Sequence, residues 1–273
     1  MTYLAFHLLF IVPPIVALAV WLRPRRGLLP RRAGWALPAI AAIAFAWTTP
    51  WDNYLVARGV WRYGPDRVLG VIGHVPVEEY LFFVLQPLLA GLWFYAVLAR
   101  RSERAEGAGG AAANGQRLRG FTPAEGAAVR DTFFAAGIRV AGAAAGLIVA
   151  AAGAAALALG GAGTYAGLIL VWAAPVLAGL WIYAGGEVWP RRRACLLGIA
   201  APTAYLWAAD ALAIQLGIWS IDPRLSTGAA LAGLPVEEAL FFLATNVLVV
   251  VGLVALLHPP ADALRIPRPA VDS

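Results

Sequence analysis

The tetrapeptide Pro-Val-Glu-Glu occurs twice in this chain, and each copy opens an apolar stretch that continues into Phe-Phe. The first copy is Pro76–Glu79, and the second is Pro235–Glu238. A charged side chain at the centre of a bilayer costs about 2.5–3.5 kcal/mol on insertion scales, so paired carboxylates beside such stretches are rarely accidental. The duplication therefore predicts two related halves whose carboxylates carry the chemistry.

The apolar stretches are long enough to cross a membrane. Of the 273 residues, 61% are hydrophobic and 13% are charged, whereas a soluble domain has about 45–50% apolar and about 25% charged residues. A span needs about 20 mainly apolar residues. The arginines near the N-terminus follow the first stretch, which favours a retained helix over a secretory signal. The expected spans are Tyr3–Leu22, Ala36–Val60, Val77–Ala99, Thr132–Gly160, Tyr165–Ala184, Ala194–Ile218 and Val236–Leu257.

The repeat extends beyond the glutamates. Asp52, Gly59 and Trp61 match Asp210, Gly217 and Trp219 at an offset of 158, and the tetrapeptides match at 159. We expect an all-α integral membrane protein with seven transmembrane helices, in two parallel three-helix repeats joined by a linker helix. The expected division is a first repeat over 1–99, a loop and linker helix over 100–160, a second repeat over 161–258 and an irregular cytoplasmic tail over 259–273. Within it, the Gly- and Ala-rich segment Arg100–Arg130 is interpreted as a mobile loop.

The arginines predict how the chain sits in the membrane. All 21 basic residues are Arg, and sixteen of them follow the first, third and fifth spans or lie in the tail. Four lie on the opposite side, and Arg139 lies inside the fourth span. The positive-inside rule then predicts an N-terminus outside and a C-terminus in the cytoplasm. The net charge of +6 is interpreted as contact with lipid headgroups, with no nucleic acid as a partner.

The carboxylates are the candidate catalytic groups. Two carboxylates held close together in an apolar setting do not both ionise cheaply, so one is expected to stay protonated as a donor while the other accepts. Aromatic faces nearby would stabilise a developing cation. This combination suits protonation of an alkene, rearrangement of a carbocation and loss of a proton. The candidate catalytic residues are Glu78, Glu79, Glu237, Glu238, Asp52 and Asp210.

Residues on the same helical faces, or next to the motifs, are the candidate substrate contacts. On a helix that turns about 100° per residue, Glu79 shares a face with Gln86, and Glu238 with Thr245. Trp61 and Trp219 are also included, although anchoring at the membrane interface is their more ordinary role. Launching a helix is the plainer role for a single Glu pair in a first turn, but the duplication with its Asp, Gly, Trp and Phe-Phe partners argues against that role here. The candidate contacts are Phe82, Phe83, Phe241, Phe242, Gln86, Asn53, Thr245, Asn246, Trp61 and Trp219.

These motifs resemble the membrane-embedded lycopene cyclases. The segments that carry the resemblance in the first half are Thr48–Tyr54, Gly59-Val60-Trp61 and Pro76–Phe83. Those in the second half are Gly217-Ile218-Trp219, Leu234–Glu238 through Phe241-Phe242, and Thr245-Asn246. In that family the halves occur as two subunits or as one fused chain, and this chain resembles the fused form.

The resemblance implies conversion of the ψ end groups of lycopene into β-ionone rings, through γ-carotene to β-carotene, with no net redox change. The expected partners are lycopene or a related linear carotenoid and the lipid bilayer, with other enzymes of carotenoid synthesis as candidates. No cofactor is expected, because the chain has no strand–GxGxxG–helix unit. No metal is expected either, since a lone Cys195 offers no thiolate site.

Three other kinds of protein share features with this chain. Cyclases of longer C50 carotenoids share these motifs, so the substrate length and the ring type stay open. Small transporters also have a three-one-three arrangement, but they need a polar pathway, and the polar residues here gather at one end. A microbial rhodopsin is excluded, because it needs a Schiff-base lysine and this chain has no lysine.

Overall fold

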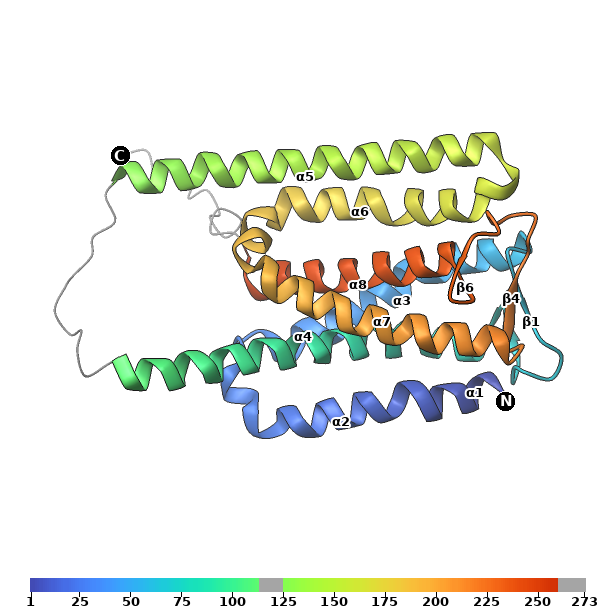
Figure 1. Ribbon diagram of the computed structural model, residues 1–273, viewed down its shortest axis with the longest axis horizontal. Helices are drawn as coiled ribbons and strands as arrows, with labels where there is room; N and C mark the ends of the chain where they lie inside the picture. The colour runs from blue at the N-terminus through green and yellow to red at the C-terminus, as the bar shows by residue number, and fades with distance from the viewer. Residues whose placement is uncertain (113–124, 260–273) are drawn as a thin grey trace, which may run out of the picture.

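The computed structural model describes residues 1–112 and 125–259, which are mostly helical (Figure 1). The first helical segment is interrupted by a π-helical stretch, His7–Ile11, between α1 and α2. Short 3-10 turns follow α2 and α6. The helices are α1 (Tyr3–Phe6), α2 (Val12–Leu22), α3 (Ala33–Ala57), α4 (Val77–Ala112), α5 (Glu125–Leu159), α6 (Thr164–Val188), α7 (Arg192–Gln215) and α8 (Val236–Leu257).

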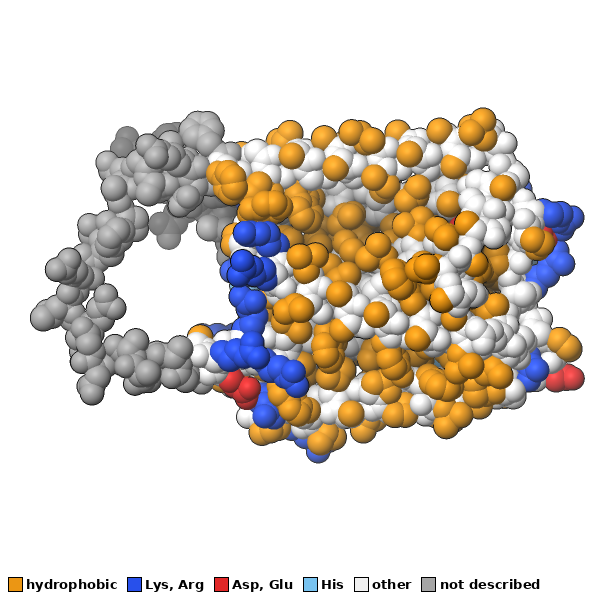
Figure 2. All heavy atoms as spheres, viewed as in Figure 1, with side chains coloured by type: hydrophobic (Ala, Val, Ile, Leu, Met, Phe, Trp, Pro, Cys, Tyr) orange, Lys and Arg blue, Asp and Glu red, His pale blue; other side chains and the backbone are white. Residues whose placement is uncertain are grey.

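Apolar helices long enough to cross a membrane dominate the described residues. Five segments meet that standard of length and composition, and one of them, Gly161–Gln215, contains both α6 and α7. The other four are Tyr3–Leu28, Val77–Ala105, Phe134–Leu159 and Val236–Leu257, so α3 is not among the five. Figure 2 shows a broad hydrophobic surface with basic side chains gathered at its two ends, which is the distribution expected of a protein embedded in lipid.

The helices form a bundle with its long axis along the helices. In Figure 1, α3, α4, α7 and α8 occupy the middle, α5 and α6 lie on one side, and α1 and α2 lie on the other. The packed pairs include α5 with α6, α6 with α8, α3 with α4, α4 with α7, and α2 with α4. One cluster of buried apolar side chains lies toward the end of the bundle where α2 ends and α7 begins, the arginine-rich end. A second cluster, richer in aromatic rings, lies toward the other end.

The expected loop over Arg100–Arg130 is wrong for most of its length. Helix α4 continues to Ala112 and α5 already begins at Glu125, while residues 113–124 lie outside the described part of the chain. Ala, Arg and Glu are all good helix formers, and an ion pair of 2.9 Å joins Arg25 to Glu103 beside this extension. The expected tail lies outside the described residues from position 260 onward.

Three short antiparallel ribbons at one end of the bundle also depart from an all-α fold. Strands β1 (Trp61–Tyr63) and β4 (Trp219–Ile221) pair across the two halves. Hairpins β2–β3 (Val71–Ile72, Val75–Pro76) and β5–β6 (Ala230–Leu231, Leu234–Pro235) precede α4 and α8. Gly59 and Gly217, with φ of 72° and 64°, end α3 and α7 in the left-handed conformation that terminates helices. The extended residues that follow then satisfy their backbone groups by pairing with each other.

Candidate active site

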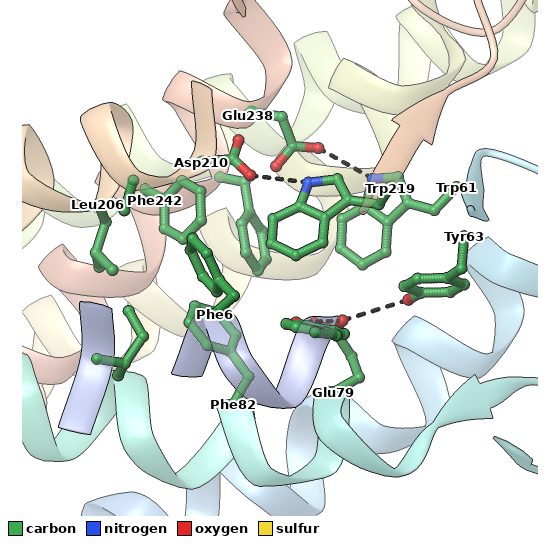
Figure 3. A pocket seen from close by; sticks show the side chains of 14 residues that line it. Phe6, Trp61, Tyr63, Glu79, Phe82, Leu206, Asp210, Trp219, Glu238 and Phe242 are labelled. Carbon is green, nitrogen blue, oxygen red and sulfur yellow. Dashed lines mark hydrogen bonds between the residues drawn. The ribbon is translucent and has the colours of Figure 1, made fainter. Parts of the chain in front are cut away.

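A pocket lies at the ribbon end of the bundle, among residues from both halves. Figure 3 shows Glu79 on one side of it and Asp210 and Glu238 on the opposite side, with aromatic rings between them. Its lining residues are Tyr3, Phe6, Ile11, Trp61, Tyr63, Glu79, Phe82, Leu206, Ala209, Asp210, Trp219, Glu238, Phe241 and Phe242. The second glutamate of each Pro-Val-Glu-Glu motif therefore faces one common pocket.

Each of these two glutamates has one carboxylate oxygen held by two donors. Oε2 of Glu79 accepts hydrogen bonds from the hydroxyls of Tyr3 (2.7 Å) and Tyr63 (3.3 Å). Oε1 of Glu238 accepts them from the hydroxyl of Tyr165 (2.8 Å) and the indole of Trp61 (3.0 Å). Within the described residues the other oxygen of each carboxyl has no partner, so it is the one available to exchange a proton.

Tyr3 and Tyr165 were missed as site residues by the sequence reasoning. They occupy the same place in each half, since each lies in the first turn of the first helix of its half. The backbone N–H of Tyr3 donates to the carbonyl of Arg67 (2.8 Å), and that of Tyr165 donates to the carbonyl of Leu225 (2.9 Å). The sequence could have pointed to both tyrosines, since a tyrosine starts the first expected span of each half.

The first glutamate of each motif points elsewhere. Oε1 of Glu78 accepts a hydrogen bond from the backbone N–H of Leu69 (2.8 Å). Oε1 of Glu237 accepts bonds from the N–H and the hydroxyl of Thr227, at 2.6 and 2.7 Å. Neither Glu78 nor Glu237 lines the pocket, so both tie the loop before their helix to its first turn. The four glutamates, expected as one catalytic set, thus lie in two different settings.

The two aspartates also differ. Asp210 lines the pocket, and its Oδ1 accepts a hydrogen bond from the indole of Trp219 (2.9 Å). Asp52 is fully buried, and neither of its oxygens has a partner within the described residues. A buried polar group without a partner is costly, and within the described residues the Asp52 carboxyl contributes no hydrogen bond to the fold.

Aromatic side chains make most of the remaining wall. Trp61 is 7% exposed and its indole nitrogen bonds Glu238, so it lies within the site rather than at the membrane interface as a plain anchor. The ring of Trp219 packs against Tyr3 and Phe6, with centroids 4.8 and 5.5 Å apart. The electron-rich faces of such rings stabilise a positive charge that develops beside them.

Tyr63, on β1 outside the long helices, donates to Glu79 whenever its hydroxyl carries a proton. Burial, and then the neighbouring charge of Glu79, raise the pKa of Tyr63 well above its usual value. The phenol is therefore a hydrogen-bond donor to Glu79 at neutral pH. The corresponding position in the second half is Ile221, so Glu238 has no such partner and uses the indole of Trp61 instead.

The other expected contacts lie away from this pocket. Phe83, Gln86 and Thr245 line an apolar groove that adjoins it. Asn246 is fully buried, accepts a hydrogen bond from Gln86 (2.8 Å) and donates one to Thr203 (2.9 Å). This chain of side chains crosses between α4, α8 and α7.

Asn53 has a structural setting of its own. Its amide nitrogen donates to the Tyr80 hydroxyl, and its oxygen accepts from the backbone N–H of His74, each at 2.9 Å. It therefore fastens the β2–β3 hairpin to α3.

Comparison with known proteins places the chain in one family. A family model described as lycopene cyclase matches residues 1–98 and 164–256. The chain belongs to the lycopene cyclase family. A lycopene beta-cyclase from Halobacterium salinarum is 40% identical over 253 residues, which cover 93% of this chain and 94% of that protein. A bifunctional lycopene cyclase/phytoene synthase from Pyrenophora tritici-repentis is 36% identical over 93% of this chain, but over 40% of its own length.

The two matched segments of the lycopene cyclase family model coincide with the segments that supply the pocket. The unmatched residues between them, 99–163, include the extension of α4 and all of α5, and none of those that the structure describes lines the pocket. No solved structure matches this chain.

Proposed function

We propose that this lycopene cyclase family member is a lycopene β-cyclase that converts the ψ end groups of lycopene into β-ionone rings. The observation that carries the proposal is the placement of Glu79 and Glu238, one from each repeated motif, across one aromatic pocket. The relatives named lycopene beta-cyclase support the substrate class and the ring type.

The reaction needs a proton donor, a proton acceptor and stabilisation of a cation. A protonated carboxyl adds its proton to C2 of an end group, which leaves a tertiary cation at C1. The C5–C6 double bond attacks C1 and closes the ring, and a carboxylate removes the proton from C6. Glu79 and Glu238 are proposed as this acid–base pair, assisted by Asp210 and Asp52. The rings of Trp61, Trp219 and the nearby phenylalanines would shield the cation from water and stabilise it.

The hydrogen bonds to the glutamates support this assignment. Because two donors hold one oxygen of each carboxyl, the other oxygen is fixed in position while it gives or takes a proton. The two carboxyls differ in their donors, as two tyrosines hold Glu79 while a tyrosine and a tryptophan hold Glu238. We therefore propose unequal roles for Glu79 and Glu238 around a single site.

The same proposal includes the arrangement in the membrane. All seven long helical segments, α3 included, are proposed to cross the bilayer as two parallel three-helix repeats with α5 as the connector. Corresponding contacts in the two halves support the repeat, among them the backbone bonds of Tyr3 and Tyr165 to loops at an offset of 158. The arginines at one end support a cytoplasmic position for that end.

The test is pigment analysis after expression in a bacterium that accumulates lycopene. The wild-type chain is expected to produce β-carotene. Glu79→Gln and Glu238→Gln should each lower the rate by about 100-fold or more, as expected for loss of a general acid or base. The adjacent Glu78→Gln and Glu237→Gln are matched controls, because a Gln oxygen can still accept the backbone bonds that these side chains receive. Their activity should stay within about tenfold of wild type.

The four variants also separate the possible outcomes. Equal losses in all four would contradict the division between a pocket glutamate and a loop glutamate. Identical rate losses for E79Q and E238Q in purified protein would contradict unequal roles. If lycopene is left unchanged by a wild-type chain shown to be in the membrane, the assignment to lycopene is wrong, and a C50 carotenoid becomes the substrate to test.

A further inference from the structure

Two apolar grooves run along the outside of the bundle. Groove A lies between α3, α6 and α8 and has a volume of about 470 Å³. Groove B lies between α2, α4 and α7 and has a volume of about 520 Å³. Several residues that line groove A are strongly exposed, such as Ile43 (58%) and Trp47 (47%). Groove A therefore opens sideways, toward the surroundings of the helices.

The two grooves occupy corresponding places in the two halves. Leu18 of groove B and Leu180 of groove A are 162 residues apart, as Tyr3 and Tyr165 are. Leu89 and Leu248 are 159 apart, the offset of the repeated tetrapeptides. A symmetric molecule would thus have two equivalent routes from the lipid to the carboxyls.

Only groove A adjoins the pocket. Phe82 and Phe241 line both groove A and the pocket of Glu79 and Glu238. The residues described as lining groove B include no residue of that pocket. The space within the pocket is about 30 Å³, which is far too small for a whole carotenoid. The length of the substrate must lie in the apolar space beside Phe82 and Phe241.

A hydrogen bond joins α7 to the π-helical stretch beside groove B. The hydroxyl of Tyr205, which lines groove B, donates to the carbonyl of Phe10 at 2.6 Å. That carbonyl lacks its usual partner in the helix, because the residue four positions on is Pro14, which has no N–H. The next residues, Ile11 and Leu206, already line the pocket. In groove A the counterpart of Tyr205 is Trp47 at an offset of 158, and no such bond forms there within the described residues.

We propose that groove A holds the polyene chain of the linear carotenoid, and that groove B does not, so that an end group reaches the carboxyls from one side of the molecule only. This inference rests on the proposed function. Residues of α8 from Phe241 to Leu256 line groove A, a length of about 22 Å at 1.5 Å per residue, which suits an extended chain. The end group passes between Phe82 and Phe241 into the pocket. The two ends of one substrate are then cyclised in turn, after the monocyclic product has left groove A and returned the other way round.

The experiment places the same bulky side chain in each groove. Leu180→Trp in groove A should lower the conversion of lycopene by about 100-fold, as expected when a reacting group is misplaced by an ångström or more. Leu18→Trp, at the corresponding half-buried position of groove B, should stay within about twofold of wild type. Ala255→Phe and Ala96→Phe form a second matched pair at the far ends of the grooves. Membrane yield and thermal unfolding in detergent show whether each variant folds.

A second readout does not depend on turnover. Lycopene retained per mole of purified protein, measured by its absorbance, should fall with L180W and not with L18W. Equal effects of L180W and L18W on both readouts, or a selective effect of L18W, would overturn the inference. A lipid chain as the natural occupant of groove A would leave both readouts of L180W at the wild-type level. If the wild-type chain forms no rings the proposed function fails, and retained pigment still decides where a carotenoid binds.

Discussion

At the scale of single residues, the site depends on which oxygen of each glutamate is held. The tyrosine hydroxyls that hold Glu79 and Glu238 lie at 2.7 Å from Tyr3 and 2.8 Å from Tyr165. A hydrogen bond to a charged group contributes about 1.5–3 kcal/mol. Tyr3→Phe and Tyr165→Phe should therefore each lower the rate of cyclisation by about tenfold or more. Tyr63→Phe should cost less, because its bond to Glu79 is longer, at 3.3 Å.

The control for these variants is Tyr95→Phe. The hydroxyl of Tyr95 donates to the carbonyl of Ala33 at 3.0 Å, in the cluster toward the arginine-rich end. Its loss should lower the thermal unfolding temperature without changing the rate per folded molecule. Rates are measured by chromatography with purified protein and lycopene in mixed micelles. A Y3F protein with the wild-type rate would show that Tyr3 does not position Glu79.

The sequence identified part of this site for a clear reason. A duplicated carboxylate pair in an apolar setting is rare, so the glutamates could be singled out without a structure. Whether Glu78 or Glu79 enters the pocket depends on the path of the preceding loop, and the sequence does not show that path. Tyr3 and Tyr165 were missed because a tyrosine at the start of a span is also common at membrane interfaces.

At the scale of elements, the β1–β4 ribbon joins the two halves by side chains as well as by its backbone. The carboxylate of Asp222, just after β4, accepts bonds from Arg62 of β1 (2.8 Å) and from Arg224 (2.7 Å). Mainly through its hydrogen bonds, Arg224 holds the pKa of Asp222 well below its usual range. Both arginines are largely exposed, at 61% and 79% of their side chains, so solvent and salt screen the interaction.

This lowered pKa predicts how stability changes with pH. Because the carboxyl of Asp222 binds its proton less readily in the folded state, it contributes stability above its unfolded pKa of about 3.9. The contribution is lost as the pH falls through the lower folded value. Asp222→Asn should thus lower the unfolding temperature in detergent at pH 7, and its difference from wild type should shrink below about pH 4. Added salt should shrink the difference as well.

Asp66→Asn is the control for this prediction. Asp66 is an exposed residue of the same end, and its φ of 56° suits asparagine equally well. It should show no comparable change with pH. A D222N difference that stays constant from pH 7 to pH 3 would contradict a role for the ionised carboxylate.

The long helices of this fold can be predicted from the sequence, whereas the short ribbons cannot. The ends of most long helices follow from apolar length and from glycines such as Gly59 and Gly217, so their positions could be expected. Strands of two or three residues carry no period that a pattern can reveal. Their pairing depends on the two helix ends meeting in space, which is a tertiary event.

At the scale of the whole molecule, sequence duplication does not yield functional symmetry. Trp61 of the first half bonds Glu238 of the second, whereas Trp219 bonds Asp210 of its own half. Only one of the two grooves adjoins the pocket. The pocket at the ribbon end is lined by one glutamate from each half, so neither half is expected to be sufficient alone.

The direction of the whole molecule in the membrane is the last prediction. Arginines such as Arg26 and Arg192 gather at one end of the bundle, and the carboxyl pocket lies at the other (Figures 1 and 2). By the positive-inside rule we expect the arginine-rich end to face the cytoplasm and the pocket to lie near the outer surface. Single cysteines can report this in a Cys195→Ala background, since the native thiol is buried and that replacement removes it altogether.

Gly27→Cys and Leu231→Cys are suitable reporters. Gly27 is exposed and has nothing within 4 Å of an added Cβ, and Leu231 is 60% exposed on β5 beside the pocket. In intact cells a membrane-impermeant maleimide should label L231C, and it should label G27C only after the membrane is opened. The reverse pattern would invert the orientation and leave the pocket on the cytoplasmic side. Either result tells which leaflet lies nearer to the carboxyls, because Leu231 lies at the same end of the bundle as the pocket.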